Sequence, residues 1–313
     1  QINEAKKSGA KFRGFVWYQG ESNTKEHAGQ YQSQLAELIS RVRKLTGDSQ
    51  LPAIVVQIGS ATSYSGRDWA AAIVREAPRR LSLADRNVAL VTAIDAEIGD
   101  YTVHLSNAGS QVVAQRVAAA ADRLAYGNDD AYWGPQFQQA FFADKERRVV
   151  VAEFTNVNDE MQLGEGWLAG FGASVNTRLP DDLATIENAY ELGPLPDDYI
   201  YPIDGRAIGK ARVALLFDKP LPEDARLSYA APRNAQYGPH RRWGLEFTGL
   251  QDASGHQAPA FVLVPIHPAK ESIAVTFSKG DERPAGEWKQ LAVNCIGRFP
   301  PAITQPSEEA GVK

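Results

Sequence analysis

The sequence predicts an α/β chain in two parts: a parallel sheet with helices on both faces, then a β-rich part. Three continuous apolar runs of strand length, residues 12–18, 51–59 and 87–95, are separated by single helical patterns. Strands that are apolar on both faces and alternate with helices are typical of a parallel sheet between two helical layers. We therefore expect a three-layer α/β/α domain over residues 1–127 and a β-rich, sandwich-like domain over residues 128–299.

A helical pattern follows each of the three strands, over about residues 31–45, 68–82 and 112–124. In the first of these, apolar side chains recur at three- and four-residue steps, which is the period of a helix with one buried face. Residues suited to end or begin these helices stand where they are needed: Gly47, Asp68 and Ser106.

The second part contains short strand-like runs with no helical period between them, at residues 148–154, 211–217, 260–264 and 272–277. Their connections are rich in proline, glycine and aspartate, which favours a β-sandwich or an extension of one. Residues 300–313 follow two prolines, and we expect them to form a loosely ordered tail.

The composition argues against several classes of protein. The 33 basic and 38 acidic residues give a net charge of −5, and no basic block is present, so neither nucleic acid nor an anionic membrane is expected as the main partner. A single cysteine, Cys295, excludes an internal disulfide framework. The five histidines have no ligand-like spacing, so we expect no metal and no other cofactor. The oligomeric state is left open.

Residues 17–23, Trp-Tyr-Gln-Gly-Glu-Ser-Asn, stand at the carboxyl end of the first predicted strand. Open α/β sheets bind ligands outside the carboxyl ends of their strands. Gln19 offers an amide donor for a developing oxyanion, Gly20 allows the backbone to approach closely, and Glu21 offers a carboxylate. The segment is therefore either part of an active site or a polar turn after a strand.

His104 lies in the loop after the third predicted strand, just before the helix cap Ser106. A histidine at the same edge of the sheet as Gln19 is placed to act as a general base, and a nearby carboxylate would fix its tautomer. Taken alone, His104 could equally be a hydrogen-bonded loop histidine. The two loops together favour a hydrolase.

These segments resemble the sialate O-acetylesterase family, a carbohydrate-esterase branch of the SGNH (or GDSL) hydrolases. The order and spacing of the two blocks match the family. The specific similarity lies in the first 110 residues, in 17–23, Tyr31, 51–57, Arg75-Glu76 and 104–109. A weaker similarity extends into the second part through residues 134–135, 228–229, 249–250 and 258–261.

The resemblance implies a flavodoxin-like SGNH domain and a serine esterase that removes acetyl groups from sugars such as sialic acids or xylan. It also implies an extracellular or periplasmic location. His104 matches the catalytic histidine, and Gln19 matches the position of the oxyanion hole, with the backbone of Gly20 beside it. Trp17 and Asn23 of the same block are expected to contact the sugar.

Two residues are candidates for the acid of the triad. Glu21 is the carboxylate of the Gln-Gly-Glu motif. Asp100 precedes His104 by four residues, whereas many members of the family place the acid three residues before the histidine, where this chain has Tyr101. We favour Glu21 and keep Asp100 as the alternative.

The nucleophile block of the family, a Gly-Gln-Ser or Gly-Asp-Ser upstream of the Gln-Gly-Glu motif, has no match in this chain. The pairs Gly59-Ser60 and Gly109-Ser110 are better explained as turn and cap residues. In the strand order 2-1-3-4-5, the three predicted strands would be the later ones, which leaves an apolar, unpaired edge at residues 15–17. We therefore expect the carboxyl portion of a longer esterase that is inactive by itself.

Two alternatives stay open. A non-catalytic carbohydrate-binding protein would use aromatic side chains as stacking platforms, with Tyr132, Trp133, Tyr237, Trp243 and Trp288 as candidates, although most aromatic residues of a β-sandwich belong to its core. Another SGNH esterase or lipase would need an apolar acyl pocket.

Overall fold

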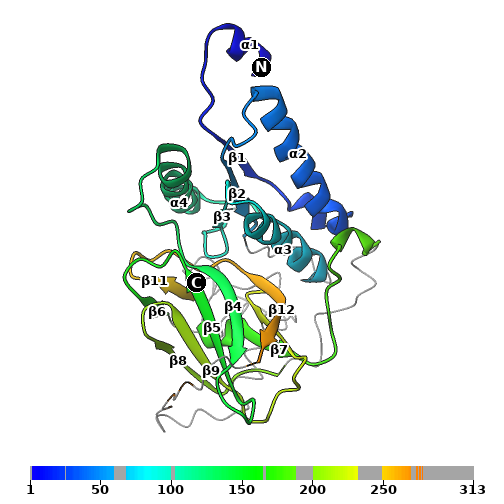
Figure 1. The fold of residues 1–313 in the computed structure, drawn as a ribbon, viewed down its shortest axis with the longest axis vertical. Coiled ribbons are helices and arrows are strands. Elements are labelled where there is room, and N and C mark those ends of the chain that lie inside the picture. Colours follow the sequence, from blue (N-terminus) through cyan, green and yellow to red (C-terminus); the bar gives the residue numbers. More distant parts are fainter. Residues whose placement is uncertain are drawn as a thin grey trace, which may run out of the picture.

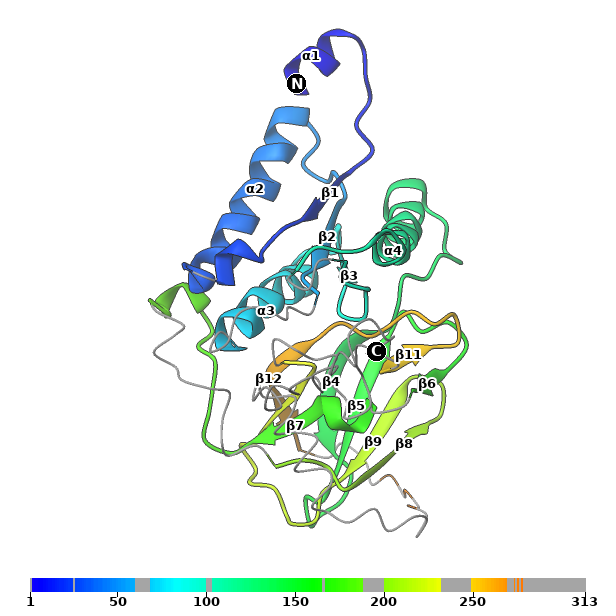
Figure 2. The ribbon, with the colours of Figure 1, turned by 180° about the vertical axis from the view of Figure 1, so that it is seen from behind.

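The chain has two parts, a parallel sheet with its helices and a curled β sheet, drawn one above the other in Figures 1 and 2. The computed structural model describes residues 2–24, 26–59, 68–99, 103–164, 167–187, 200–231, 249–268, 273, 275 and 277. No helix in these ranges is long and apolar enough to cross a membrane. The predicted tail, residues 300–313, lies outside them.

The first part is built on three parallel strands in the order β1-β2-β3, namely β1 (Phe15–Tyr18), β2 (Ala53–Gln57) and β3 (Val88–Thr92). Every residue of β2 and β3 is buried. Their continuous apolar sequences are therefore explained by contact with helices on both faces, as predicted.

Three helices cover the sheet: α2 (Tyr31–Thr46), α3 (Asp68–Ala84) and α4 (Asn107–Tyr126). Helices α2 and α3 pack on one face and α4 on the other, which Figures 1 and 2 show from opposite sides. The three predicted helices are confirmed. Gly47 ends α2 in a left-handed conformation, and the Ser106 side chain accepts a hydrogen bond from Gly109 N at the start of α4. A short helix that the sequence did not predict, α1 (Ile2–Lys7), precedes β1.

Strand β1 is the exposed strand of this sheet. Within the described ranges it pairs with β2 alone. Phe15 and Trp17 pack toward α2 and α3, whereas Val16 is 51% exposed and Tyr18 is 36% exposed on the other face. The unpaired edge expected at residues 15–17 is therefore present in the described part of the chain, and Val16 exposes its side chain on the face opposite α2 and α3.

Where the structure describes the second part, it contains nine short strands: β4 (Gln136–Phe142), β5 (Val149–Thr155), β6 (Met161–Leu163), β7 (Phe171–Ser174), β8 (Asp204–Ile208), β9 (Arg212–Leu216), β10 (Arg226–Tyr229), β11 (Leu250–Asp252) and β12 (Phe261–His267). The predicted strands at 148–154, 211–217 and 260–264 are β5, β9 and β12. Half of the predicted strand at 272–277, namely residues 272, 274 and 276, lies outside the described residues, so this strand stays a prediction.

These strands differ from the expected sandwich of two facing sheets. Seven of them form one sheet in the order β7-β10-β12-β4-β5-β9-β8, and β11 and β6 form a separate pair. The large sheet curls, as Figure 1 shows, and a bridge between Ala173 of β7 and Ile200 brings its two ends near each other. Aromatic rings fill the inside of the curl, with Phe137 and Phe261 stacked at a centroid distance of 3.9 Å. In the described residues, the main apolar core lies inside this sheet, and a second apolar cluster, of Phe141, Ala143, Val151 and Ala214, lies on its other face.

Candidate functional site

The carboxyl ends of β1, β2 and β3 lie at one edge of the parallel sheet. The loop that carries Gln19, Gly20 and Glu21 leaves β1 at this edge, and the loop that leads to His104 leaves β3 there. Because β2 lies between them and neighbouring strands are about 4.8 Å apart, the ends of β1 and β3 are separated by about 10 Å. The two predicted loops thus begin at the same edge, within reach of one bound molecule.

Gly20 is a position that only glycine fits. Its φ angle is +148°, in the region that side chains disfavour. A Cβ atom on Gly20 would lie 2.8 Å from Val74 Cγ1 and 2.9 Å from Ile58 Cγ2. The backbone of the Gln-Gly-Glu loop is therefore pressed against the end of β2 and against helix α3.

The side chain and the carbonyl of Gln19 are both held by neighbours. Gln19 Nε2 donates to Asn23 Oδ1 at 2.7 Å, and the Tyr31 hydroxyl donates to the carbonyl of Gln19. An amide group carries two N–H donors, so the bond to Asn23 uses one and the other can meet an oxyanion. Asn23, a predicted sugar contact, is thus also the residue that orients Gln19.

Tyr31 and Trp17 support this loop from the side of the helices. Burial is the main cause that raises the pKa of Tyr31 to about 12, so its hydroxyl remains a hydrogen-bond donor at neutral pH. Trp17, the other predicted sugar contact, is half-buried and packs into the core between β1 and the helices α2 and α3. Its ring is therefore placed for packing on that face.

Tyr18 is a residue of the site that the sequence did not single out. Partial burial and the carboxylate of Glu21 raise its pKa, while the backbone of Gly59 and the charge of Arg75 act in the opposite direction. Its phenol group therefore lies near Glu21, at the ends of both β1 and β2. The sequence pattern that could have identified Tyr18 is the two-residue period of β1, which puts Tyr18 on the face of the strand opposite Trp17.

His104 lies between β3 and α4, on a segment that backbone hydrogen bonds hold in place. Gly99 N donates to the carbonyl of His104 at 2.8 Å, Ser106 N donates to the carbonyl of Glu97 at 2.9 Å, and a bridge joins Ile98 to Leu105. The side chain of His104 is exposed. Backbone hydrogen bonds thus hold the described residues on both sides of the turn that carries His104.

Of the two candidate acids, the structure describes Glu21 but not Asp100. Glu21 is half-buried beside Gln19, whereas Asp100 and Tyr101 lie outside the described residues. A third carboxylate at this edge, Asp95, is bound to the Arg116 guanidinium through two oxygens at 2.6 and 2.7 Å. Asp95 is therefore engaged in an ion pair with a buried arginine.

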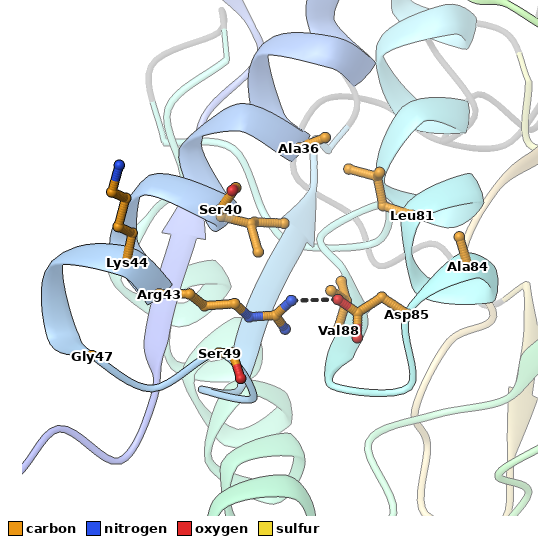
Figure 3. Close-up of a pocket in the computed structure, with 11 residues that line it drawn as sticks. Ala36, Ser40, Arg43, Lys44, Gly47, Ser49, Leu81, Ala84, Asp85 and Val88 are labelled. Carbon is orange, nitrogen blue, oxygen red and sulfur yellow. Dashed lines mark hydrogen bonds and ion pairs between the residues drawn. The ribbon is translucent and has the colours of Figure 1, made fainter.

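A pocket of about 560 Å³ lies at the opposite edge of the sheet, between α2 and α3 (Figure 3). It is lined by Ser49, which precedes β2, and by Val88, which begins β3, and the ion pair between Arg43 and Asp85 lies inside it. Sites of open α/β sheets form at the carboxyl ends of the strands, so this amino-terminal pocket is not the candidate active site.

The structure also locates residues considered for other roles. Trp133 donates its ring N–H to the carbonyl of Leu90 at 2.9 Å and packs against the core under α4, so it is a structural residue. Three other predicted stacking platforms, Tyr237, Trp243 and Trp288, lie outside the described residues. In the part of the chain that is described, no group of three or more His, Cys, Asp or Glu residues is arranged to hold a metal ion.

Comparisons with known proteins give a family match and two similar structures. Residues 1–123 match the family model described as carbohydrate esterase, sialic acid-specific acetylesterase, which confirms the resemblance for this part of the chain. A carbohydrate acetylesterase from Xanthomonas citri is 23% identical with a TM-score of 0.58, and the match covers 80% of this chain and 50% of that one. This likeness supports the fold.

A protein from Arabidopsis thaliana is 27% identical with a TM-score of 0.33, and the match covers 39% of this chain and 49% of that one. This chain spans about half the length of the Xanthomonas protein. No curated protein matches the chain.

Proposed function

We propose that the protein is a carbohydrate O-acetylesterase, because residues 1–123 match the model of the sialic acid-specific acetylesterases, a family of carbohydrate esterases. The observation that carries the proposal is the pair of loops at one edge of the sheet, with Gln19, Gly20 and Glu21 after β1 and His104 after β3. An amide, a carboxylate and an imidazole at one edge are the groups that acyl transfer from an ester requires in addition to a nucleophile.

The proposed reaction has two steps. A serine hydroxyl attacks the acetyl carbonyl while His104 takes its proton, and the oxyanion of the tetrahedral intermediate is bound by Gln19 Nε2 and by backbone N–H groups near Gly20. His104 then gives the proton to the departing sugar oxygen, which leaves an acetyl-enzyme. Water, activated by His104, releases acetate in the second step. Glu21 orients the imidazole and stabilises its charged form, and Asp100 is the alternative for this role.

We propose that the nucleophilic serine belongs to a segment upstream of Gln1. The sequence of this chain has no counterpart of the nucleophile block, and the edge of β1 that is unpaired within the described residues offers a place where further strands of the same sheet can pair. By this proposal the chain in its present length has little or no activity. The substrate is an acetylated sugar such as a sialic acid or xylan, and the site of action is extracellular or periplasmic.

The proposal is tested by acetate release from acetylated sialic acid and acetylated xylan, with a form of the protein extended upstream of Gln1. Loss of one side-chain donor to an oxyanion costs about 10²–10³ in rate, so Gln19→Ala should lower kcat by that factor. Gln50→Ala, which changes an exposed glutamine at the other edge of the sheet, is the matched control. A Gln19→Ala enzyme with the kcat of the control would contradict the role of Gln19.

A further inference from the structure

Arg75 is a fully buried cation where helix α3 meets both parts of the chain; its exposed fraction is 0%. Among the described residues, its guanidinium donates to four backbone carbonyls, in two pairs. Nε and Nη2 donate to Ile58 O at 3.2 Å and Gly59 O at 2.7 Å, at the end of β2. Nη1 donates to Ala230 O at 3.4 Å and Ala231 O at 3.3 Å, just after β10 of the curled sheet. One side chain therefore binds the carboxyl edge of the parallel sheet to the β-rich part.

Two more buried side chains bind the same junction. Gln57 Nε2 donates to the carbonyl of Arg75 at 3.0 Å and to that of Ala260 at 2.9 Å. Glu76 accepts a hydrogen bond from Val262 N at 3.3 Å. Gln57 and Glu76 are 0% and 1% exposed. Buried polar groups are costly unless they are hydrogen-bonded, so these contacts fix one relative placement of the two parts.

The junction is connected to the Gln-Gly-Glu loop by direct packing. Ile58, whose carbonyl Arg75 binds, and Val74, which precedes Arg75, are the residues that a Cβ atom on Gly20 would meet first. Tyr18 is affected electrostatically by Arg75 and interacts with the backbone of Gly59. A shift of the Ile58-Gly59 segment would therefore displace Gly20 and, with it, the flanking Gln19 and Glu21.

We propose that Arg75 is a positioning residue of the esterase site, and that the β-rich part serves to hold the carboxyl edge of the parallel sheet through it. Arg75 is too deeply buried to touch a substrate, so it acts through Gly59, Ile58 and Gly20. The planar guanidinium, with its donors in a fixed fork, can span the two pairs of carbonyls, whereas a lysine ammonium is a single point of charge. This inference rests on the proposed esterase function and extends it to the β-rich part.

The structural half of the proposal is tested on the chain in its present length. Arg75→Lys and Arg75→Met are compared with Arg43→Met by hydrogen exchange. Arg43 is a matched control because it is also largely buried and donates to backbone carbonyls, those of Leu51 and Asn87, but at the amino edge of the sheet. We expect amide exchange in residues 57–59 and 228–231 to accelerate at least about tenfold in the Arg75 variants and not in Arg43→Met. Unchanged exchange in Arg75→Lys would overturn the proposal, and this variant keeps the test valid if Arg75→Met does not fold.

The catalytic half is tested on the form extended upstream of Gln1. Because a small misplacement of catalytic groups can cost about 10²-fold in rate, kcat of Arg75→Lys should fall by about 10 to 100-fold with KM nearly unchanged. Arg43→Met should keep the kcat of the wild type. Equal kcat values for Arg75→Lys and Arg43→Met would refute the positioning role. If instead the wild-type extended form releases no acetate while the exchange result holds, the esterase proposal fails and the structural link through Arg75 stands.

Discussion

Gln57 and Ala260, 203 residues apart, bind each other through two hydrogen bonds, from Gln57 Nε2 to Ala260 O at 2.9 Å and from Ala260 N to Gln57 Oε1 at 2.8 Å. The side-chain amide of Gln57, at the end of β2, thus forms hydrogen bonds with both the N–H and the C=O of Ala260, the residue directly before β12. The parallel sheet and the curled sheet consequently share a buried polar contact. Their stabilities should be coupled.

Gln57→Met should therefore destabilise the whole chain. The substitution keeps the length of the side chain but leaves the N–H and C=O of Ala260 without partners, and each unsatisfied buried group costs about 1–3 kcal/mol. We expect a loss of about 3 kcal/mol in the free energy of unfolding by urea. Gln50→Met, at an exposed position, should change this free energy by less than about 0.5 kcal/mol. Equal stability of the two variants would contradict the coupling.

Gly20→Ala should be more damaging than an alanine at another glycine with positive φ. The new methyl group would overlap Val74 Cγ1 and Ile58 Cγ2, in addition to the strain of a φ angle of +148°. Gly127, with φ of +76° and no atom within 4 Å of its Cβ position, is the matched control. Thermal unfolding should show a loss of about 1 kcal/mol for Gly127→Ala and about 3 kcal/mol or more for Gly20→Ala. A smaller loss at Gly20 than at Gly127 would show that the loop does not pack as described.

The pair of Asp95 and Arg116 should behave as a buried ion pair. The Arg116 side chain is 1% exposed, so Asp95→Asn leaves a buried cation with a weakened partner. We expect urea unfolding to show that either single variant, Asp95→Asn or Arg116→Met, loses about 3–5 kcal/mol in its free energy of unfolding. The double variant should lose clearly less than the sum of the two. The exposed pair Glu37 and Arg41 on helix α2 should give a coupling below about 0.5 kcal/mol in the same cycle. Additive losses at Asp95 and Arg116 would rule out the expected coupling.

His256 should make the stability of the chain depend on pH. Burial is the main cause that lowers its pKa, with Arg116 acting in the same direction and Asp252 and Asp95 opposing it. The unfolded chain binds the proton at about pH 6.5, so it takes up a proton before the folded chain does. Stability is therefore full above about pH 6.5 and falls as the pH drops through the lower pKa of the folded state.

The measurement for His256 is urea unfolding at a series of pH values from 7 to 5. His256→Gln should show a shallower loss of stability over this range than the wild type. His27→Gln replaces a histidine whose side chain is 61% exposed, and it should keep the wild-type slope. If the free energy of unfolding fell with pH equally in His256→Gln and in the wild type, His256 would not be the cause of the pH dependence.

The helical layers were predictable because their signals are local. The period of α2, the left-handed Gly47 at its end and the Ser106 cap of α4 lie within a few residues of the turns that they form. The strands of the curled sheet depend on distant partners. For example, β7 and β10 pair Phe171 with Tyr229, and neither short strand has a pattern of its own that marks it. The curl of the sheet, which depends on such pairings, was therefore beyond local analysis.

In the candidate site, too, some residues could be predicted from the sequence and others could not. Gln19, Glu21 and His104 could be singled out because polar residues directly after apolar strands indicate the functional edge of an α/β sheet. Arg75 is one of the residues on which the resemblance to the family rests. Its structural role could not be predicted, because one of the carbonyls that it binds, that of Ala230, is 155 residues away in the sequence. Long-range backbone contacts of this kind leave no trace in a single sequence.

Acetate release by the form extended upstream of Gln1 tests most directly whether the two loops form an acetylesterase site. His104→Ala is compared with His27→Ala, which changes an exposed histidine near the start of α2. Removal of the base of a catalytic triad costs several orders of magnitude, so His104→Ala should lower kcat on acetylated sialic acid at least about 10³-fold. His27→Ala should leave kcat unchanged. Full activity of His104→Ala would contradict the account.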